Sequence, residues 1–197
     1  MLDRESMPLA AIEYRRGFDI DDLLLRSCTH LRSQGLRIGG AIQRSSGDRG
    51  QCAASVHVVD LRSGREFDIW EARGACVRGC RLDERGLIDV EPSIMAALAD
   101  GVDLIVVNRF GRAESLGRGL FRCFTAALEA SVPVLTAVRA QYDEAWLQFH
   151  GGLGRSLPPG IDRILEWCLT AAASTRATDK RTIMPASTEA SMPMQPG

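Results

Sequence analysis

The chain has 197 residues, of which 45% are hydrophobic and 25% are charged, and its formal net charge is −1. This composition is typical of a globular protein with a sizeable core, and the charge balance gives no electrostatic reason to expect binding to nucleic acid or to an anionic membrane. No apolar run reaches the roughly 20 residues that a helix needs to cross a bilayer, so we expect no membrane insertion. The first residues do not resemble a signal peptide, which predicts a cytoplasmic protein of bacterial type.

Strands and helices are predicted to alternate along the first half of the chain. A short apolar run at 8–14 predicts a first strand, and apolar residues at helical spacing predict a helix over 18–35. Residues 36–43 have the pattern of a second strand. The segment 54–72 predicts two further strands joined by a tight turn, which is an inserted β-hairpin.

The same alternation continues in the second half. Residues 87–101 predict a helix that is interrupted or begins again near Pro92. The continuous β-branched run at 102–108 predicts a buried strand with cover on both faces. The remaining elements are a helix around 115–130, a strand at 132–138, and helices at 143–152 and 160–172.

This order of elements predicts a single α/β domain over residues 8–172, with a mainly parallel sheet flanked by helices. Residues 173–197 are polar, rich in small residues and proline, and without periodicity, which predicts a disordered tail. Ligands of such sheets bind beyond the carboxyl ends of the strands. We therefore expect three loops to meet there, namely those that follow the strands at 8–14, 102–108 and 132–138.

The loop after the first strand has the position of a phosphate-binding P-loop but lacks its residues. A working P-loop needs several glycines, a lysine for the β- and γ-phosphates, and a serine or threonine for magnesium. The stretch "EYRRGFDIDD" has only Gly17 and neither of the other groups. Arg15 and Arg16 are candidate anion contacts near a helix N-terminus, or else solvated turn arginines. The three aspartates of the first turn argue against a polyphosphate.

The strand end "LIVVNRFGRAESLGRGL" carries the most distinctive polar residues of the chain. Asn108 offers a donor and an acceptor, and Arg109 and Arg112 offer fixed donor forks suited to an oxyanion. Gly111 and Gly117 would let the backbone approach a ligand closely. This combination predicts an anion pocket.

A purely structural role for this strand end is the alternative. Arg109 could pair with Glu114 or Asp83 and pin the loop, with Gly111 only permitting a turn. Composition also matters, because Lys180 is the single lysine among 24 basic residues and the other 23 are arginines. Such a skew is typical of a GC-rich genome and weakens the argument from any one arginine.

A third candidate segment is the glycine-rich stretch "RGACVRGCRLD". Backbone amides near Gly79 and Cys80 can form an anion-binding nest, and Arg78 and Arg81 add positive charge. The same neighbours favour a Cys80 thiolate, so Cys80, with Cys76, is a candidate soft ligand for a metal or molybdenum. A buried loop cysteine is the alternative. The cysteines form no paired Cys-x-x-Cys motif and no Cys/His pattern, so we predict neither a structural zinc site nor a catalytic residue.

Two of these motifs resemble a known family. "DLIVVNRFGRAESLGRGLFRCFTAAL" and "RGCRLD" are similar to the core of a bacterial domain family of unknown function with an Asn-Lys/Arg-Phe-Gly strand end, over roughly residues 8–170. That family is in turn distantly similar to the thermostable nucleoside-triphosphatases, which are P-loop proteins. The resemblance implies a degenerate P-loop-like fold. Members of the family often lie beside molybdate-transport genes, and some carry labels as transporter ATP-binding proteins.

The resemblance argues against hydrolysis as well. In the triphosphatases this strand ends in Asp-Glu-Ile-Gly followed by a glutamate, and the acids serve magnesium and the attacking water. At the matching positions this chain has Asn108 and Arg109 in place of the two acids, while Gly111 is retained and Glu114 lies near the later glutamate. Neither magnesium nor water then has its expected ligand.

We therefore predict a non-hydrolytic accessory protein that binds an anion or a nucleotide, with molybdate as one possible ligand, in molybdenum or related metal metabolism. One alternative is a nucleoside triphosphatase with an atypical site. A second is a protein-interaction module that binds a transporter or cofactor-assembly partner through its hairpin or tail. The predicted ligand contacts are Asn108, Arg109, Gly111, Arg112, Glu114, Gly117, Arg78, Gly79, Cys80, Arg81, Asp83, Arg15, Arg16 and Gly17.

Overall fold

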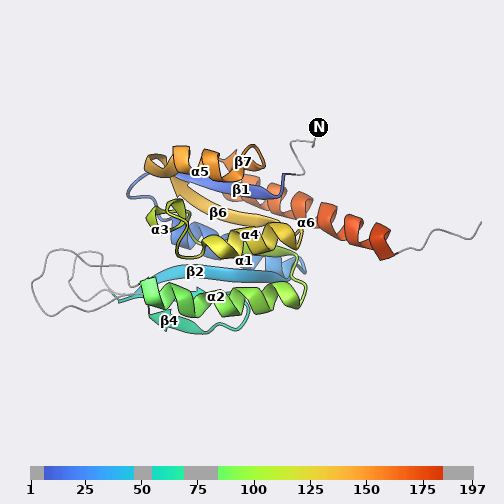
Figure 1. Cartoon of the computed structure of the whole chain (residues 1–197), viewed down its shortest axis with the longest axis horizontal. Coiled ribbons are helices and arrows are strands. Elements are labelled where there is room, and N and C mark those ends of the chain that lie inside the picture. Colours follow the sequence, from blue (N-terminus) through green and yellow to red (C-terminus); the bar gives the residue numbers. More distant parts are fainter. Residues whose placement is uncertain (1–6, 47–54, 69–83, 184–197) are drawn as a thin grey trace, which may run out of the picture.

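The computed structural model describes residues 7–46, 55–68 and 84–183 of the chain. They form a seven-stranded sheet in the order β4-β3-β2-β5-β6-β1-β7 (Figure 1). β2, β5, β6, β1 and β7 run parallel, and β3 and β4 are added antiparallel to β2. The predicted α/β class with an inserted hairpin is confirmed. The strands are β1 (Leu9–Tyr14), β2 (Ile38–Ser46), β3 (Ser55–Asp60), β4 (Glu66–Asp68), β5 (Leu104–Val107), β6 (Val134–Arg139) and β7 (Gly154–Leu157).

Helices cover both faces of the sheet. Leu104 and Val106 of β5 belong to a core that includes buried residues of α1 and α6, whereas Ile105 and Val107 belong to a core with α2, α4 and α5. Cover on both sides explains why the central strands are continuous apolar runs. The helices are α1 (Ile20–Ser33), α2 (Glu84–Ala99), α3 (Arg112–Ser115), α4 (Phe121–Glu129), α5 (Asp143–His150) and α6 (Ile161–Ile183), with a 3₁₀ turn η2 (Ala140–Tyr142).

Three elements differ from the prediction. The expected helix around 115–130 is two helices, because Gly117 and Gly119 between them adopt φ values of 70° and 59°, which a helix cannot continue through. Helix α2 is uninterrupted at Pro92, which lies on its exposed side. Strand β7 was not predicted; it pairs with β1 at the edge of the sheet.

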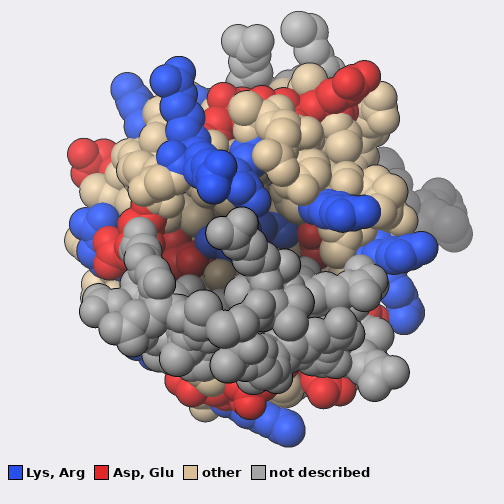
Figure 2. All heavy atoms as spheres, turned by 90° about the vertical axis from the view of Figure 1, so that its left-hand side faces the viewer, with Lys and Arg blue, Asp and Glu red and all other residues tan. Residues whose placement is uncertain are grey.

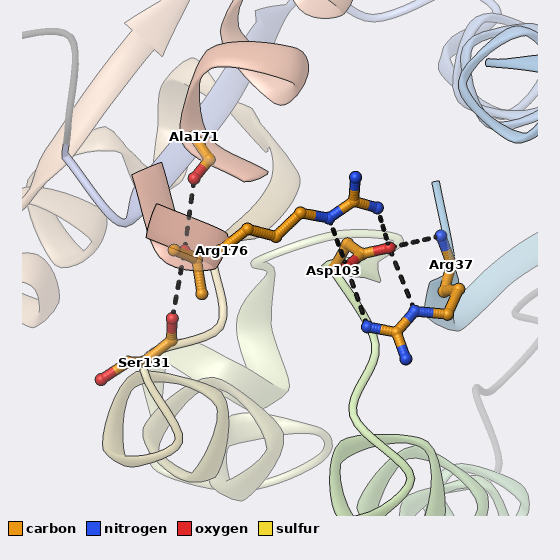
Figure 3. A network of polar contacts seen from close by, with 6 residues as sticks. Arg37, Asp103, Ser131, Ala171 and Arg176 are labelled. Carbon is orange, nitrogen blue, oxygen red and sulfur yellow. Dashed lines mark hydrogen bonds and ion pairs between the residues drawn. The ribbon is translucent and has the colours of Figure 1, made fainter. Parts of the chain in front are cut away.

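The predicted start of a disordered tail at residue 173 is corrected, because α6 continues to Ile183. Its added turns make contacts with the amino end of the sheet. The Thr175 hydroxyl donates to the carbonyl oxygens of Ser131 and Ala171, at 3.3 Å in each case. Arg176 reaches Asp103 (Figure 3). Residues 184–197 lie outside the described part of the chain.

Asp103, immediately before β5, holds the amino end of the sheet together. Its carboxylate accepts hydrogen bonds from the Arg37 amide at 2.8 Å and Arg37 Nη2 at 3.0 Å, and from Arg176 Nε at 2.9 Å and Nη2 at 2.6 Å (Figure 3). Burial of Asp103 opposes its ionisation, but the hydrogen bonds from Arg176 and Arg37 outweigh burial and hold its pKa well below the usual range. One buried charge thus joins the beginnings of β2 and β5 to α6.

Helix α5 ends at a buried histidine. His150 Nδ1 accepts the amide hydrogens of Gly152 and Gly154, each at 3.1 Å. Burial lowers the pKa of His150, and an imidazole that accepts at Nδ1 is neutral there. His150 therefore fixes the turn that leads into β7. Among the described helices, none combines the length and the apolar character needed to cross a bilayer.

Candidate functional site at the carboxyl edge of the sheet

Three strand ends lie side by side at the carboxyl edge of the sheet. Tyr14 at the end of β1 is in register with Arg139 at the end of β6, and Phe110 after β5 bridges to Val138 of β6. The loops after β1, β5 and β6 are therefore neighbours, as the parallel topology requires. Figure 2 views the molecule from this side and shows blue basic side chains gathered above the grey atoms.

Arg109 is held by two other elements. Its Nη2 lies 2.8 and 2.9 Å from the two carboxylate oxygens of Asp21, in the first turn of α1. Its Nη1 donates to Gln43 Oε1 of β2 at 2.7 Å. The side chains of Arg109 and Asp21 are only 31% and 21% exposed. Arg109 thus spans from the end of β5 to α1 and β2. Among the described residues it pairs with Asp21 and not with Glu114, whose carboxylate accepts backbone amides. The other predicted partner, Asp83, lies outside the described residues, so that pairing stays a prediction.

Asn108 supports the same ion pair. Burial raises the pKa of Asp21, while the charge of Arg109 and a hydrogen bond from Asn108 lower it, and the charge of Asp19 raises it further. The net shift is upward, so the ionised carboxylate is less favourable here than in water. Two buried atoms, Asn108 Oδ1 and Arg109 Nε, have no hydrogen-bond partner among the described residues.

Glu114 has a structural position in the loop between β5 and α4. Its carboxylate is buried and accepts the amide hydrogens of Gly111 at 3.0 Å and Leu120 at 3.2 Å. A Cβ atom on Gly119 would lie 2.5 Å from Glu114 Oε1, so this glycine makes room for the carboxylate. Gly117 has a left-handed φ of 70° with open space around it. The two glycines allow the chain to turn, and the Glu114 carboxylate lies buried within the turn.

Four other arginines lie at this edge; Arg15, Arg16 and Arg112 are exposed, and Arg139 is half-buried. Arg15 and Arg16 follow β1, Arg112 begins α3, and Arg139 ends β6. In the part of the chain that the structure describes, their side chains make no ion pair or hydrogen bond. Sequence analysis did not single out Arg139, because it closes an apolar strand without any motif; its register with Tyr14 is what brings it to the site.

A cavity of about 420 Å³ lies beside the Arg109–Asp21 pair. Gly17 and the half-exposed Phe18 border it on the α1 side, and Gln43 and Arg44 border it on the β2 side. Gly17 has a φ of 90°, so the turn after β1 depends on glycine. The cavity contains charges of both signs, because the aspartates at the start of α1 face Arg44 and Arg109 across it.

Carboxylates are also present on this edge. The charge of Glu13 adds to burial in raising the pKa of Asp143, which begins α5. Within the described residues, no three or more His, Cys, Asp or Glu side chains are grouped so that they could hold a metal ion.

Several predicted contacts fall outside the described residues, and their roles stay predictions. They are Arg78, Gly79, Cys80, Arg81 and Asp83, together with Cys76. By contrast, Cys28, Cys123 and Cys168 are buried as free thiols in the core, where burial raises their pKa. Asp21 and Gln43 were not predicted as partners of Arg109, since nothing in the local pattern connects segments so far apart in the chain.

A solved structure of similar fold is that of a human protein titled a cancer-related nucleoside triphosphatase. The likeness has a TM-score of 0.54, covers 89% of this chain and 97% of that one, and has 13% sequence identity. It shows the fold, an α/β sheet flanked by helices on both faces.

Among curated proteins, the chain is 42% identical over 149 residues to a Bradyrhizobium diazoefficiens protein named "Molybdenum import ATP-binding protein ModC 2". The match covers 76% of this chain but only 17% of that protein. A family model described as "Protein of unknown function (DUF2478)" matches residues 9–167, which include the strand end around Asn108 and Arg109. The chain therefore belongs to the DUF2478 family.

Proposed function

We propose that this protein binds a small oxyanion or a nucleotide at the carboxyl edge of its sheet and does not hydrolyse it. It would act in the cytoplasm as an accessory protein in molybdenum or related metal metabolism, with a protein partner in metal transport or cofactor assembly. The observation that carries the proposal is the place of Arg109, between the end of β5 and the first turn of α1.

The place of Arg109 supports the non-hydrolytic part. In P-loop NTPases a hydroxyl near the start of the first helix and an acid at a strand end together hold Mg²⁺. Here the corresponding elements are joined by a guanidinium–carboxylate pair, with Arg109 at the strand end and Asp21 on the helix. This pair puts a positive charge between the two elements that hold the metal in those enzymes, and no lysine follows β1 to contact a γ-phosphate.

The arginines that have no partner among the described residues support the anion-binding part. Arg15, Arg16, Arg112 and Arg139 come from three neighbouring strand ends, and no described carboxylate neutralises them. Guanidinium groups bind oxyanions through paired, charge-assisted hydrogen bonds. An anion above the ends of β1, β6 and β5 would meet several of them together. The link to molybdenum rests on the name of the larger Bradyrhizobium protein, only part of which this chain resembles.

Calorimetry and thermal shift with molybdate, tungstate, sulfate, phosphate, ATP and GTP test the binding. At least one of these anions should bind and stabilise the protein. Arg16→Ala and Arg112→Ala should each weaken that binding by about tenfold, which corresponds to one charge-assisted contact. Arg163→Ala removes an exposed arginine of α6 that pairs with Glu166, and it is the matched control that should bind like wild type. Binding of none of the six anions would refute the proposal.

A phosphate-release assay with ATP and GTP tests the absence of hydrolysis. No magnesium-dependent release above the protein-free blank is expected. Glu114 is the acid to vary, because it lies nearest to the position of the glutamate in the triphosphatases. Turnover that depends on magnesium and disappears in Glu114→Gln, with the variant still folded, would favour a nucleoside triphosphatase instead.

A further inference from the structure

The side chain that most distinguishes this strand end is already occupied by a carboxylate of the protein itself. Arg109 directs Nη2 to both oxygens of Asp21 and Nη1 to Gln43. We infer that Asp21 competes with the ligand for Arg109, so that an anion engages Arg109 only when Asp21 releases it. This inference rests on the proposed function, since it concerns how the same site is regulated.

The contacts make Asp21 a specific competitor. A carboxylate that meets one guanidinium nitrogen at 2.8 and 2.9 Å uses the donors that an oxyanion would use. Gln43 takes a donor of the second nitrogen, so both ends of the guanidinium are engaged. The pair neutralises Arg109, and an incoming anion therefore gains little from its charge while Asp21 remains ionised and in place.

The ion pair is also positioned to open. Arg109 Nε and Asn108 Oδ1 are buried without partners among the described residues, so the closed arrangement leaves two polar atoms unsatisfied. The cavity of about 420 Å³ has both Asp21 and Arg109 in its wall, and an anion can enter it without passing through the core. The guanidinium can exchange Asp21 for a ligand oxygen by a movement of side chains alone.

Protonation of Asp21 would favour release. The groups that face it are Asp19, which caps α1, and Asp22 on α1, Gln43 and Arg44 on β2, and Asn108 and Arg109 after β5. Burial raises the pKa of Asp21 more than Arg109 and Asn108 lower it. As the pH falls, Asp21 takes up a proton from solvent before an ordinary aspartate would, and Arg109 then carries an unbalanced positive charge. Anion affinity should therefore rise toward acidic pH.

Calorimetric titration of the full chain with molybdate at neutral pH gives a direct test. Asp21→Asn keeps the shape of the side chain but removes its charge, and it should bind molybdate about tenfold more tightly than wild type, by the value of one charge-assisted contact. The double variant Asp21→Asn/Arg109→Ala should lose that gain. Asp22→Asn removes the neighbouring charge, which pairs with Arg26 and not with Arg109, and should change the affinity by less than about threefold.

A second variant and a second probe keep the test decisive if Asp21→Asn is poorly folded. Gln43→Leu removes the other tether of Arg109 and should raise the affinity in the same direction by a smaller factor. Sulfate keeps its charge between neutral and mildly acidic pH, so a change in its binding reports on the protein. Wild type should bind sulfate more tightly at mildly acidic pH, and Asp21→Asn should not.

The outcomes separate this inference from the proposed function. If wild type binds an anion and Arg112→Ala weakens it, but Asp21→Asn and Gln43→Leu bind no more tightly, Asp21 is no competitor and the proposed function stands. An equal gain in Asp22→Asn, or a gain that survives Arg109→Ala, also overturns the inference. If neither wild type nor the variants bind any anion, both proposals fail.

Discussion

Replacing Asp103 with asparagine removes the negative charge that joins β2, β5 and α6 at the amino end of the sheet. The carboxylate is 2% exposed and accepts from the main chain and side chain of Arg37 and from the side chain of Arg176. The amide of asparagine keeps one acceptor oxygen and presents a donor where the carboxylate accepted. One of the two guanidinium groups then faces an N–H group in place of an oxygen.

The expected loss of stability lies between two limits. A hydrogen bond to a charged group contributes about 1.5–3 kcal/mol, and an exposed ion pair contributes about 0–1 kcal/mol. The Asp103 carboxylate is buried, whereas the side chains of Arg37 and Arg176 are 64% and 51% exposed. The contribution of each arginine to the free energy of unfolding should therefore lie between these two limits. We expect Asp103→Asn to lower the free energy of unfolding by about 2–3 kcal/mol in total.

Urea denaturation followed by circular dichroism measures this change, with the slope m checked for constancy. The effect should depend on pH in a defined direction. Because the pKa of Asp103 is depressed in the folded protein, its stabilisation is present above the unfolded pKa of about 3.9 and is lost as the pH falls through the folded value. The difference between wild type and variant should therefore be constant near neutral pH and shrink in acid.

Glu166→Gln is the control, because it removes a carboxylate from an ion pair whose two side chains, those of Arg163 and Glu166, are 67% and 65% exposed. It should change the free energy of unfolding by less than about 0.5 kcal/mol. If Asp103→Asn proves no more destabilising than this control, the three-element junction contributes no stability and the reasoning is wrong.

Three further changes test other parts of the structure. Burial depresses the pKa of His150, so wild type should lose stability as the pH falls from about 6.5 through the lower folded pKa. In His150→Asn the side-chain Oδ1 replaces Nδ1 as the acceptor but does not titrate, so thermal melts of this variant should show a flatter pH dependence. In urea titrations, Gly119→Ala should lower the free energy of unfolding by about 2 kcal/mol or more, because its Cβ would clash with the Glu114 carboxylate. Gly117→Ala has open space for its Cβ and only the strain of a left-handed backbone, so it should lower the free energy of unfolding by about 1 kcal/mol. Gly40→Ala should abolish soluble expression, because its Cβ would lie 2.0 Å from the Val106 carbonyl oxygen.

The central part of the fold could be predicted because its signals are local. The β-branched run of β5 and the turn between β3 and β4 specify their own conformation. Strand β7 could not be predicted, since Leu157 is the only one of its four residues that is buried, and its pairing with β1 decides its conformation. The added turns of α6 are likewise stabilised by contacts distant in sequence, above all that of Arg176 with Asp103.

The candidate site was predictable as a place but not as a set of contacts. The order of strands was enough to bring Arg15, Asn108 and Arg112 to one edge. The partner of Arg109 could not be predicted, because Asp21 precedes Arg109 by 88 residues and the local spacing indicated Glu114. Glu114 instead bonds to backbone amides of its own turn, an arrangement that depends on the left-handed glycine at 119.

Helix α6 also bears on where this domain ends. The family match stops at residue 167, inside the helix, yet Cys168, Ala171 and Ala172 are buried in the core that α6 shares with α1. A fragment cut at the edge of the match would uncover that core and leave Asp103 with Arg37 alone. The unit that folds is therefore longer than the unit that sequence comparison delimits, and any recombinant or grafted version of this domain should extend at least through Arg176.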